Sequence, residues 1–568
     1  MAERSTQGDS GEAARGPADW ILTQARIWTG HGASRPGALA IRDGRILALG
    51  RDADELEGLN GRTTAILPLE GRTIVPGFVD AHVHLQAGGL HLFRVDLRAA
   101  VSPAGFVQGV ADRARMMPDG GWILGGDWDH THWGGELPTR EWLDRAAPGR
   151  PVFLQRTDLH MGVASSRALE LAGITAETPD PERGFIDRDP ATGEPTGILR
   201  ERAMGLMSRV VPPPTTEERR GAIQAAVLHA LTRGVTQLHD MGALESPEES
   251  WRSLFTLQDL YREGRLPIRV SAAVPLADRM ELAGLIDEEG RGDARLRWGG
   301  VKSFVDGSLG SRTAWFHESY LDANGYPDDH RGAPVEDLDE LADQLLEAAD
   351  LGLQPIVHAI GDRATDWILE VFARVAQAHP GADLRPRVEH AQHMSPEGIV
   401  AAGRGRSICS MQPLHLVDDG RWAGPLLGPD REARSFPIGS LRAAGASLAF
   451  GSDWTVAPID PIGSLEAAVT RRVWNSDVQA WGGPWIPEER ISLEAALRAH
   501  TLDAARAAFL DHETGSLEPG KRADLTILSA DPFECAPEEL RERVQVEMTF
   551  VDGTLVHRAD DPTKGGPE

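Results

Sequence analysis

Between residues 73 and 454 the sequence alternates short apolar segments with longer amphipathic stretches. The apolar segments are 73–85, 234–242, 267–274, 299–307, 354–360, 385–392, 406–413 and 446–454. In one of the stretches between them, Ile368, Val371 and Val375 share the apolar face of an amphipathic helix. Strands that alternate with helices indicate βα units and a parallel sheet. Eight such units predict an α/β fold, a closed (β/α)8 barrel of the TIM type.

Both ends of the chain carry short β-like segments around a turn signal. Asp43-Gly44 and Asp552-Gly553 each separate two apolar-alternating runs, which is typical of a tight hairpin. Neither end is long enough to bury a core alone, so we predict that both contribute to one small discontinuous β-sandwich domain. The expected limits are 1–18 for a disordered lead, 19–72 with 515–558 for the β domain, 73–514 for the barrel and 559–568 for a polar tail.

The first and second barrel strands are too far apart for a simple βα unit. From His84 to Val235 there are 151 residues, whereas one unit needs about 30. Residues 86–220, rich in Trp, Gly and Pro, are therefore expected to form an insertion. Because the C-terminal ends of the strands carry the active site in such barrels, we expect this insertion to wall or cover the pocket.

The charge and cysteine content of the chain exclude some classes of binding partner. The chain has 58 basic and 86 acidic residues, a net charge of −28, which argues against nucleic acid and anionic membranes. No apolar run approaches the roughly 18 residues of a membrane-spanning helix. Cys409 and Cys535 cannot supply a disulfide framework and suit a reducing, cytoplasmic location. We expect a small-molecule partner, and a homo-oligomer is possible.

A His-x-His pair, His82 and His84, ends the first barrel segment. Side chains two residues apart in a strand point to the same side, so both imidazoles face the barrel mouth. Such a pair suits a transition metal such as zinc. A second pair, His130 and His132, lies in a Trp/Gly-rich loop without a strand beneath it, and surface or lid positions are favoured there.

Four further residues stand near the C-terminal ends of other barrel segments: Lys302, His358, His390 and Asp453. Each has an ordinary alternative: a hydrogen-bonded core histidine, a capping aspartate or a lysine at a strand edge. Their shared position favours a site, because barrel chemistry gathers at that rim. A buried lysine loses its charge readily and its neutral amine can add CO₂ to form a carbamate that bridges two metals. Otherwise Lys302 is a structural ion-pair partner.

Several ordered motifs resemble those of the amidohydrolase superfamily. They include PGFVDAHVHL, KSFVDGSLGSRTA, HAIGDRA, EHAQ, GSDW and the tail ALRAHTLDAARAAFLDHETGSLEPGKRADLTIL. The resemblance extends from about residue 20 to 557 and is strongest to amidohydrolase family 3, a branch that includes N-substituted formamide deformylase.

The resemblance implies a centre of two zinc ions. His82, His84 and Asp453 would hold one ion, His358 and His390 the other, and N-carboxylated Lys302 would bridge them. Asp453 would also orient the hydrolytic water and pass its proton to the leaving amine.

Four other residues are candidates for substrate binding: His160, His239, Arg312 and His415. Arg312 either receives a substrate oxygen through its planar fork or acts as a structural clamp. The segment TDLHMG departs from the family pattern, because Leu159 stands where glycine is usual. This change puts inherited substrate preferences near His160 in doubt.

The leading hypothesis is a metal-dependent hydrolase of a non-peptide C–N bond in an amide, N-formyl or N-acyl compound. One alternative is a mononuclear-metal deaminase or cyclic-amide hydrolase on the same barrel, with Lys302 uncarboxylated. Another is a non-enzymatic relative of the fold, which we would expect to have lost ligands.

Overall fold

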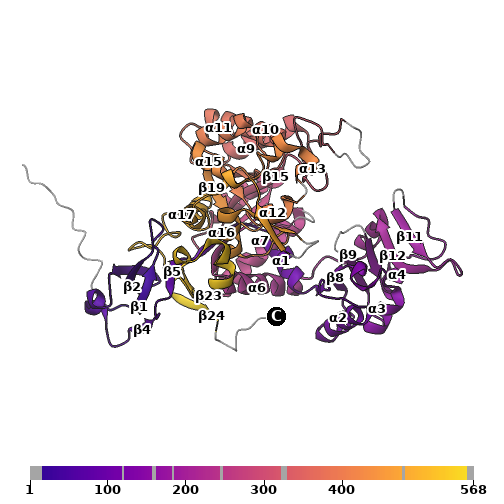
Figure 1. Cartoon of the computed structure of the whole chain (residues 1–568), viewed down its shortest axis with the longest axis horizontal. Helices are drawn as coiled ribbons and strands as arrows, with labels where there is room; N and C mark the ends of the chain where they lie inside the picture. The colour runs from indigo at the N-terminus through magenta and orange to yellow at the C-terminus, as the bar shows by residue number, and fades with distance from the viewer. Residues whose placement is uncertain are drawn as a thin grey trace, which may run out of the picture. The chain divides into compact units, whose positions relative to one another are not determined.

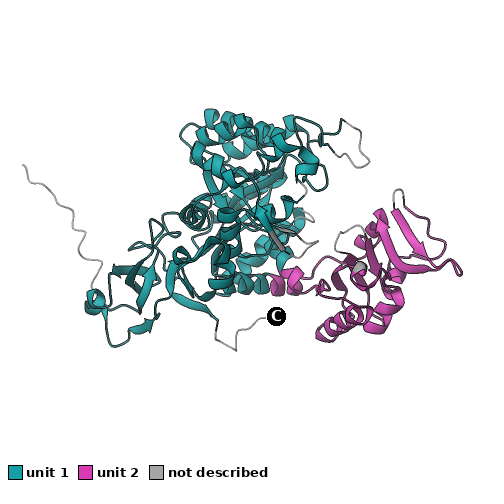
Figure 2. Ribbon diagram, viewed as in Figure 1, with its two compact units in different colours: residues 1–88, 223–568 teal, residues 89–222 magenta. Residues whose placement is uncertain are grey.

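The computed structural model describes residues 16–117, 120–156, 161–181, 184–243, 247–321, 329–421, 423–475 and 480–559. The chain divides into two compact units (Figure 2). The first comprises residues 1–88 and 223–568, and the second comprises residues 89–222. The second unit is the long segment that separates the first two barrel strands.

The first unit contains an eight-stranded parallel sheet (Figure 1). In spatial order its strands are β6 (Phe78–Val83), β13 (Val235–Asp240), β14 (Arg269–Pro275), β15 (Leu296–Phe304), β16 (Gln354–Ala359), β17 (Arg387–His390), β18 (Ile408–Met411) and β19 (Ser447–Phe450). A parallel bridge between Val83 and Trp454 links the last strand back to the first. The predicted (β/α)8 barrel is confirmed.

Outside the inserted segment, helices lie between the strands along the chain, and several of them pack against the barrel sheet. They are α1 (Leu85–Leu92), α6 (Thr216–Thr232), α7 (Pro247–Arg262), α8 (Arg279–Glu289), α9 (Leu338–Asp350), α10 (Asp362–Ala378), α11 (Pro396–Arg404), α12 (His415–Asp419), α13 (Ala423–Leu427), α14 (Pro429–Glu432), α15 (Ile438–Ala444), α16 (Pro461–Thr470), α17 (Leu493–Ala499), α18 (Leu502–Ala507) and α19 (Leu540–Arg543). In α10, Ile368, Val371 and Val375 form the buried face that their spacing predicts. Across the described ranges, no helix has the length and apolar character needed to cross a membrane.

The segment predicted as one strand over 73–85 is two strands. Thr73–Pro76 forms β5, which pairs with strands from both chain ends, and the barrel strand β6 begins at Phe78. Gly77 between them lies against the second barrel strand, where a Cβ atom would approach Thr236 Oγ1 to 2.2 Å. Apolar patterning alone did not reveal this break, because both strands are fully buried, although Pro76-Gly77 between them is a turn signal.

Strands from the two ends of the chain form one eight-stranded sheet. Its members are β1 (Trp20–Ile27), β2 (Arg35–Arg42), β3 (Arg45–Gly50), β4 (Ala65–Pro68), β5, β22 (Leu525–Leu528), β23 (Val546–Val551) and β24 (Thr554–Arg558). Both predicted hairpins are confirmed by the pairing of β2 with β3 and of β23 with β24. Asp43 and Gly44 have φ of 52° and 74°, and Asp552 and Gly553 have 47° and 66°. These left-handed pairs fit the twist of the flanking strands.

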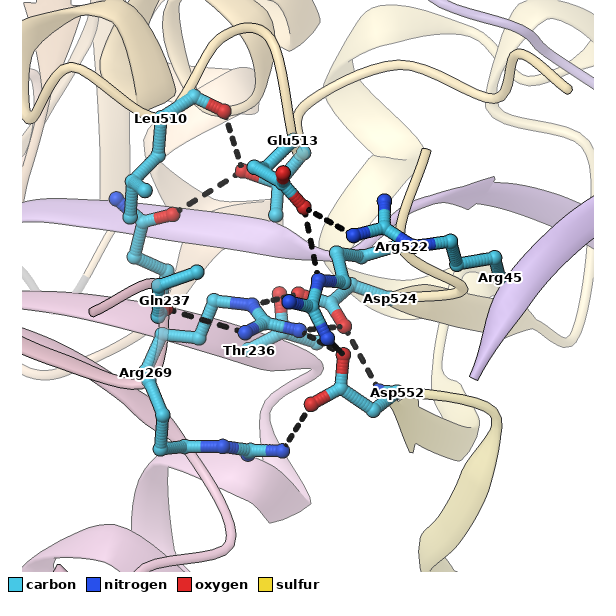
Figure 3. Close-up of polar contacts among 12 residues, drawn as sticks. Arg45, Thr236, Gln237, Arg269, Leu510, Glu513, Arg522, Asp524 and Asp552 are labelled. Atoms are coloured by element: carbon cyan, nitrogen blue, oxygen red, sulfur yellow. Dashed lines mark hydrogen bonds and ion pairs between the residues drawn. The ribbon is translucent and has the colours of Figure 1, made fainter. Parts of the chain in front are cut away.

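A buried ionic network joins this terminal sheet to the barrel (Figure 3). Arg269 of β14 is 1% exposed, and its Nε and Nη2 donate to the two carboxylate oxygens of Asp524 at 2.6 and 2.9 Å. Arg269 also pairs with Asp552 in the β23–β24 turn, to which Arg522 donates at 3.1 Å. The barrel and the terminal sheet are therefore held together by matched buried charges as well as by apolar packing.

The second unit has its own sheet and core. Its strands are β11 (Gly184–Arg188), β12 (Pro195–Glu201), β10 (Met161–Ala164), β9 (Val152–Arg156), β8 (Ile123–Trp128) and β7 (Val95–Asp96), and its helices include α2 (Pro103–Met116), α3 (Arg140–Ala146) and α4 (Ser166–Leu171). Phe106 makes edge-to-face contacts with Trp128 and Trp142 in the core. Trp128 Nε1 donates to the Leu154 carbonyl at 3.0 Å. The tryptophans of this segment that lie in this core therefore serve packing.

Candidate metal centre

The residues predicted to hold metal lie at the C-terminal rim of the barrel. His82, Lys302, His358 and His390 are in the barrel strands β6, β15, β16 and β17. His84 follows β6 directly, and Asp453 comes three residues after β19. All but His358 are less than a tenth exposed, and the His358 side chain is 13% exposed. The parallel strands place these side chains together because their C-terminal ends share one edge of the sheet.

Three of these residues form a compact cluster. One ligand atom from each of His82, His390 and Asp453 lies within 4.8 Å of the other two. Asp453 Oδ1 is 3.3 Å from His82 Nε2 and 3.4 Å from His84 Nε2. His82 Nε2 is buried without a hydrogen-bond partner among the described residues. An orphaned imidazole nitrogen beside a carboxylate fits a divalent transition metal.

Hydrogen bonds on the far side of each ring fix which nitrogen is free. The Nδ1–H of His82 donates to Glu389 Oε2 at 2.5 Å, and that of His84 donates to the Gly242 carbonyl at 2.9 Å. His390 donates in the same way to Gln412 Oε1 at 2.8 Å. Each of these rings therefore presents the lone pair of Nε2, the arrangement found in protein metal sites.

His358 presents its other nitrogen. Its Nε2–H donates to the Gly307 carbonyl at 3.0 Å, which leaves the Nδ1 lone pair free. Its ring centroid lies 4.5 Å from that of His390. The two rings could therefore share a metal through Nδ1 of His358 and Nε2 of His390.

Two of the clustered residues adopt left-handed backbone conformations. His390 has φ of 74° and Asp453 has φ of 57°. The backbone N–H of Asp453 donates to the His82 carbonyl at 2.7 Å, which ties the loop after β19 to β6. Backbone strain of this kind persists only where the surroundings enforce it, and it concentrates at functional sites.

Burial keeps the imidazoles neutral. Burial and the nearby Lys302 lower the pKa of His82 to about 4 and that of His358 to about 3. Burial and the neighbouring His358 hold the pKa of His390 well below its usual range. Burial alone would raise the pKa of Asp453, but the His82 ring and its neighbours hold it well below normal. Near neutral pH the centre thus offers neutral imidazoles at His82, His358 and His390 and an ionised carboxylate at Asp453, the protonation states required of metal ligands.

Lys302 is buried beside this cluster. Its Nζ lies 4.9 Å from the ring centroid of Phe304, and it forms no ion pair with a carboxylate of the described residues. Burial lowers the pKa of Lys302 to about 8. About a tenth of the amine is therefore neutral at pH 7, far more than for an ordinary lysine, and the neutral form is the one to which CO₂ adds.

The residues predicted from the sequence did not include Glu389, whose carboxylate accepts a hydrogen bond from His82. Glu389 is fully buried, and the Nε and Nη2 of Arg387 donate to its two oxygens at 2.8 and 3.1 Å. Arg387 and Glu389 are separated by one residue in β17, so period two places both side chains on one face. Two charged residues at alternate positions of a buried strand were the available signal.

The residues predicted to bind substrate do not lie together in one site. His415 begins α12, and its ring lies 6.3 Å from His390 in a stacked orientation. Gln392 Nε2 approaches its Nδ1 at 3.3 Å, while its buried Nε2 has no hydrogen-bond partner among the described residues. Arg312 is partly buried in the loop after β15, and its carbonyl accepts a hydrogen bond from His330 at 2.6 Å.

His239 is 1% exposed and accepts a hydrogen bond from Arg387 Nη1 at 3.0 Å. It lines a cavity to which none of the predicted metal ligands contributes, and it does not belong to the histidine cluster. His160 and Leu159 lie outside the described residues. His132 is exposed, and neither it nor His130 belongs to a three-residue metal cluster within the described ranges.

Known proteins resemble this chain along most of its length. Residues 66–557 match the amidohydrolase family. The protein LONG AFTER FAR-RED 3 of Arabidopsis thaliana is 42% identical over 95% of this chain and 92% of its own length. N-substituted formamide deformylase of Arthrobacter pascens is 30% identical over 91% of this chain and 94% of its own.

Among solved structures, an uncharacterized metal-dependent hydrolase from Pyrococcus furiosus superimposes with a TM-score of 0.71 and 31% identity. That match covers 91% of this chain and 99% of the other. Together with the clustered rim residues, these similarities show that the chain is a hydrolase acting on carbon–nitrogen bonds and belongs to the amidohydrolase family.

Proposed function

We propose that this chain is a binuclear zinc amidohydrolase that cleaves a non-peptide C–N bond in a small amide, N-formyl or N-acyl compound. The observation that carries the proposal is the cluster of His82, His390 and Asp453, in which His82 Nε2 has no partner among the described residues. The relative from Arthrobacter pascens, a named deformylase of N-substituted formamides, supports an N-formyl substrate class.

The candidate metal ligands divide into two groups. His82, His84 and Asp453 would hold one ion, because Asp453 Oδ1 lies within 3.4 Å of both imidazole Nε2 atoms. His358 and His390, whose rings are 4.5 Å apart, would hold the second. Bound zinc would supply Lewis acidity toward a water molecule and toward the substrate carbonyl.

Lys302 is proposed to bridge the two groups as a carbamate. An ammonium ion would repel divalent cations, whereas a carbamate carries negative charge and two oxygen donors. Its burial without a carboxylate partner among the described residues, together with a pKa lowered to about 8, supports the neutral amine from which the carbamate forms.

The protein groups around the centre have distinct tasks. Asp453, ionised at neutral pH, would accept the proton of the hydrolytic water and pass it to the departing amine. If Gln392 donates to Nδ1 of His415, the Nε2–H of His415 is left to donate to a substrate oxygen. Such a donor stabilises negative charge that develops on the carbonyl oxygen during hydrolysis.

The test combines metal analysis with a substrate panel. Metal-replete protein should hold about two ions per chain and hydrolyse at least one of a set of N-formyl, N-acyl and cyclic amides. Replacement of both His82 and His84 by alanine should remove metal and activity together. Unchanged metal content with full activity in that variant would overturn the proposal, and one ion per chain would favour the mononuclear alternative.

A further inference from the structure

A cavity lies beside the first halves of the barrel strands β15 and β16, apart from the candidate metal ligands. It has a volume of about 190 Å³, and its walls include Gly299 and Gly300 of β15 and Gln354, the first residue of β16. None of the six candidate metal ligands lines it. Arg291, Arg297 and Arg387 all do, and Asp383 is the one acidic residue in its described lining.

The positive charge in this cavity exceeds the negative charge. Arg387 is balanced by Glu389, and Asp383 pairs with Arg385 outside the cavity lining at 2.9 Å. Arg291 and Arg297 form no ion pair with any carboxylate of the described residues. Their hydrogen bonds go instead to neutral backbone carbonyls: Arg291 Nη2 to Gly352 at 2.9 Å, and Arg297 Nη1 to Ala508 at 2.8 Å.

Local structure makes room for these two cations. Gly299 has φ of 143°, and a Cβ atom there would lie 2.4 Å from Arg291 Nη1. A glycine at this position therefore leaves the space that the guanidinium fills. The Cζ of Arg297 stands 5.2 Å from the ring centroid of Phe509, another residue of the wall. The two positive groups are thus held in defined places at the cavity.

Two wall residues carry unused hydrogen-bonding groups. Trp298 Nε1 and Ser271 Oγ are buried and have no hydrogen-bond partner among the described residues. Trp298 is 7% exposed. Both atoms have almost no accessible surface, so an occupant of the cavity would be held by the two guanidinium groups rather than by these atoms.

We propose that this cavity binds one small oxyanion, either inorganic phosphate or a small carboxylate. Guanidinium groups form forked hydrogen bonds with planar or tetrahedral oxygen clusters, which both ions offer. An anion would also offset the cost of holding two partly buried cations without counterions. The volume limits the occupant to an ion of a few heavy atoms.

Another cavity has weaker evidence for anion binding. It is lined by Arg442, Arg498 and Arg506, but Arg498 is already paired with Asp503 at 2.9 Å. Arg442 and Arg506 are exposed, so solvent and salt screen their charges. The cavity beside Arg291 and Arg297 therefore has the stronger requirement for an anion.

Calorimetric titration of the full chain tests the proposal. Sodium phosphate and sodium acetate are titrated separately at constant ionic strength, with sodium chloride as the balancing salt. We expect saturable binding of at least one of the two ions at about one per chain, and the ion that binds assigns the inorganic or the carboxylate class. Arg291→Gln and Arg297→Gln should each weaken binding about tenfold or more, because each removes charge-assisted hydrogen bonds.

Two variants separate the site from general electrostatics. Arg374→Gln removes the same charge from an exposed position on α10 and should bind like the wild type. Arg291→Lys keeps the charge but loses the fork, and should bind more weakly than wild type. Thermal unfolding checks that each variant is folded, and the bound anion should raise the melting temperature of the wild type. Absence of saturable binding to wild type, or equal binding by the Arg291→Gln/Arg297→Gln double variant, overturns the proposal.

Discussion

Glu389 Oε2 accepts a hydrogen bond from His82 Nδ1 at 2.5 Å, although the two residues are 307 positions apart in the sequence. The carboxylate is fully buried, and burial alone would raise its pKa, but Arg387 and His82 hold the pKa well below the usual range. The ionised Glu389 therefore keeps the proton of His82 on Nδ1. That leaves Nε2 directed to the cluster with Asp453.

Replacement of Glu389 should therefore weaken metal binding. In Glu389→Gln the acceptor charge is lost while the side-chain shape is kept, and zinc affinity should fall about 10–100-fold. Competition with a chromophoric chelator measures the affinity directly. Glu281→Gln, at an exposed position on α8, serves as the matched control and should bind zinc like the wild type. Equal affinity in the Glu389 variant would show that this carboxylate does not orient His82.

Lys302 cannot be replaced by arginine if its neutral amine is used. Lys302→Ala and Lys302→Arg should both lose activity, because arginine stays protonated and cannot form a carbamate. Short carboxylic acids should partly restore the alanine variant by supplying the missing oxygens. Lys521→Arg, in the turn before β22, is the control and should remain active. Full activity of Lys302→Ala in steady-state assays would exclude the bridge.

Removal of metal should destabilise the fold. The cluster holds an ionised Asp453 and orphaned imidazole nitrogen at the barrel rim, and a ligand that binds only the folded state stabilises it by mass action. At free metal a thousandfold above Kd the gain is about 4 kcal/mol. Calorimetric scans should show a lower Tm after chelation and recovery with zinc. The His82→Ala/His84→Ala variant should not respond, and an unchanged wild-type Tm would count against a bound metal.

The ionic link between the barrel and the terminal sheet should contribute measurably to stability. Asp524→Ala would leave Arg269 buried with only part of its counter-charge, and the free energy of unfolding should fall by about 3–5 kcal/mol. Asp259→Ala breaks an exposed pair with Arg262 and should cost about 1 kcal/mol or less. Denaturant unfolding compares the two. A similar small loss in both variants would mean that Asp552 compensates fully for Asp524.

The two cysteines should differ in reactivity. Cys409 is fully buried, and burial raises its pKa to about 12, whereas Cys535 is partly exposed. At pH 8 a chromogenic disulfide reagent should therefore modify Cys535 in the folded chain and Cys409 only after unfolding. Rapid modification of both thiols in native protein would contradict the burial of Cys409.

The raised pKa of Cys409 also predicts that the free energy of unfolding falls at alkaline pH. Between its ordinary value of 9.0 and about 12, the unfolded chain loses the thiol proton while the folded chain keeps it. The contribution of Cys409 to stability is therefore complete below pH 9 and is lost as pH rises through this window. Unfolding curves should show a smaller alkaline loss in Cys409→Ala than in wild type.

The amino-acid sequence by itself determined the barrel and the direction of its rim side chains. Alternation within a strand places His82 and His84 on one face, and apolar runs between amphipathic helices mark all eight strands. These are local periodicities, which depend only on neighbouring residues. For the same reason the Asp-Gly pairs at 43–44 and 552–553 predicted both hairpins.

Only the tertiary structure decided which distant groups meet. The break at Gly77 depends on the approach of Thr236, and the support of His82 depends on Glu389 from another strand. The left-handed backbone at His390 and Asp453 and the uncompensated cations beside Gly299 likewise follow from packing around them. Such partners are separated by tens to hundreds of residues, and no local period carries their identity. Their contacts exist only once the sheet has closed and excluded water, because burial is what makes an unpaired charge or donor costly.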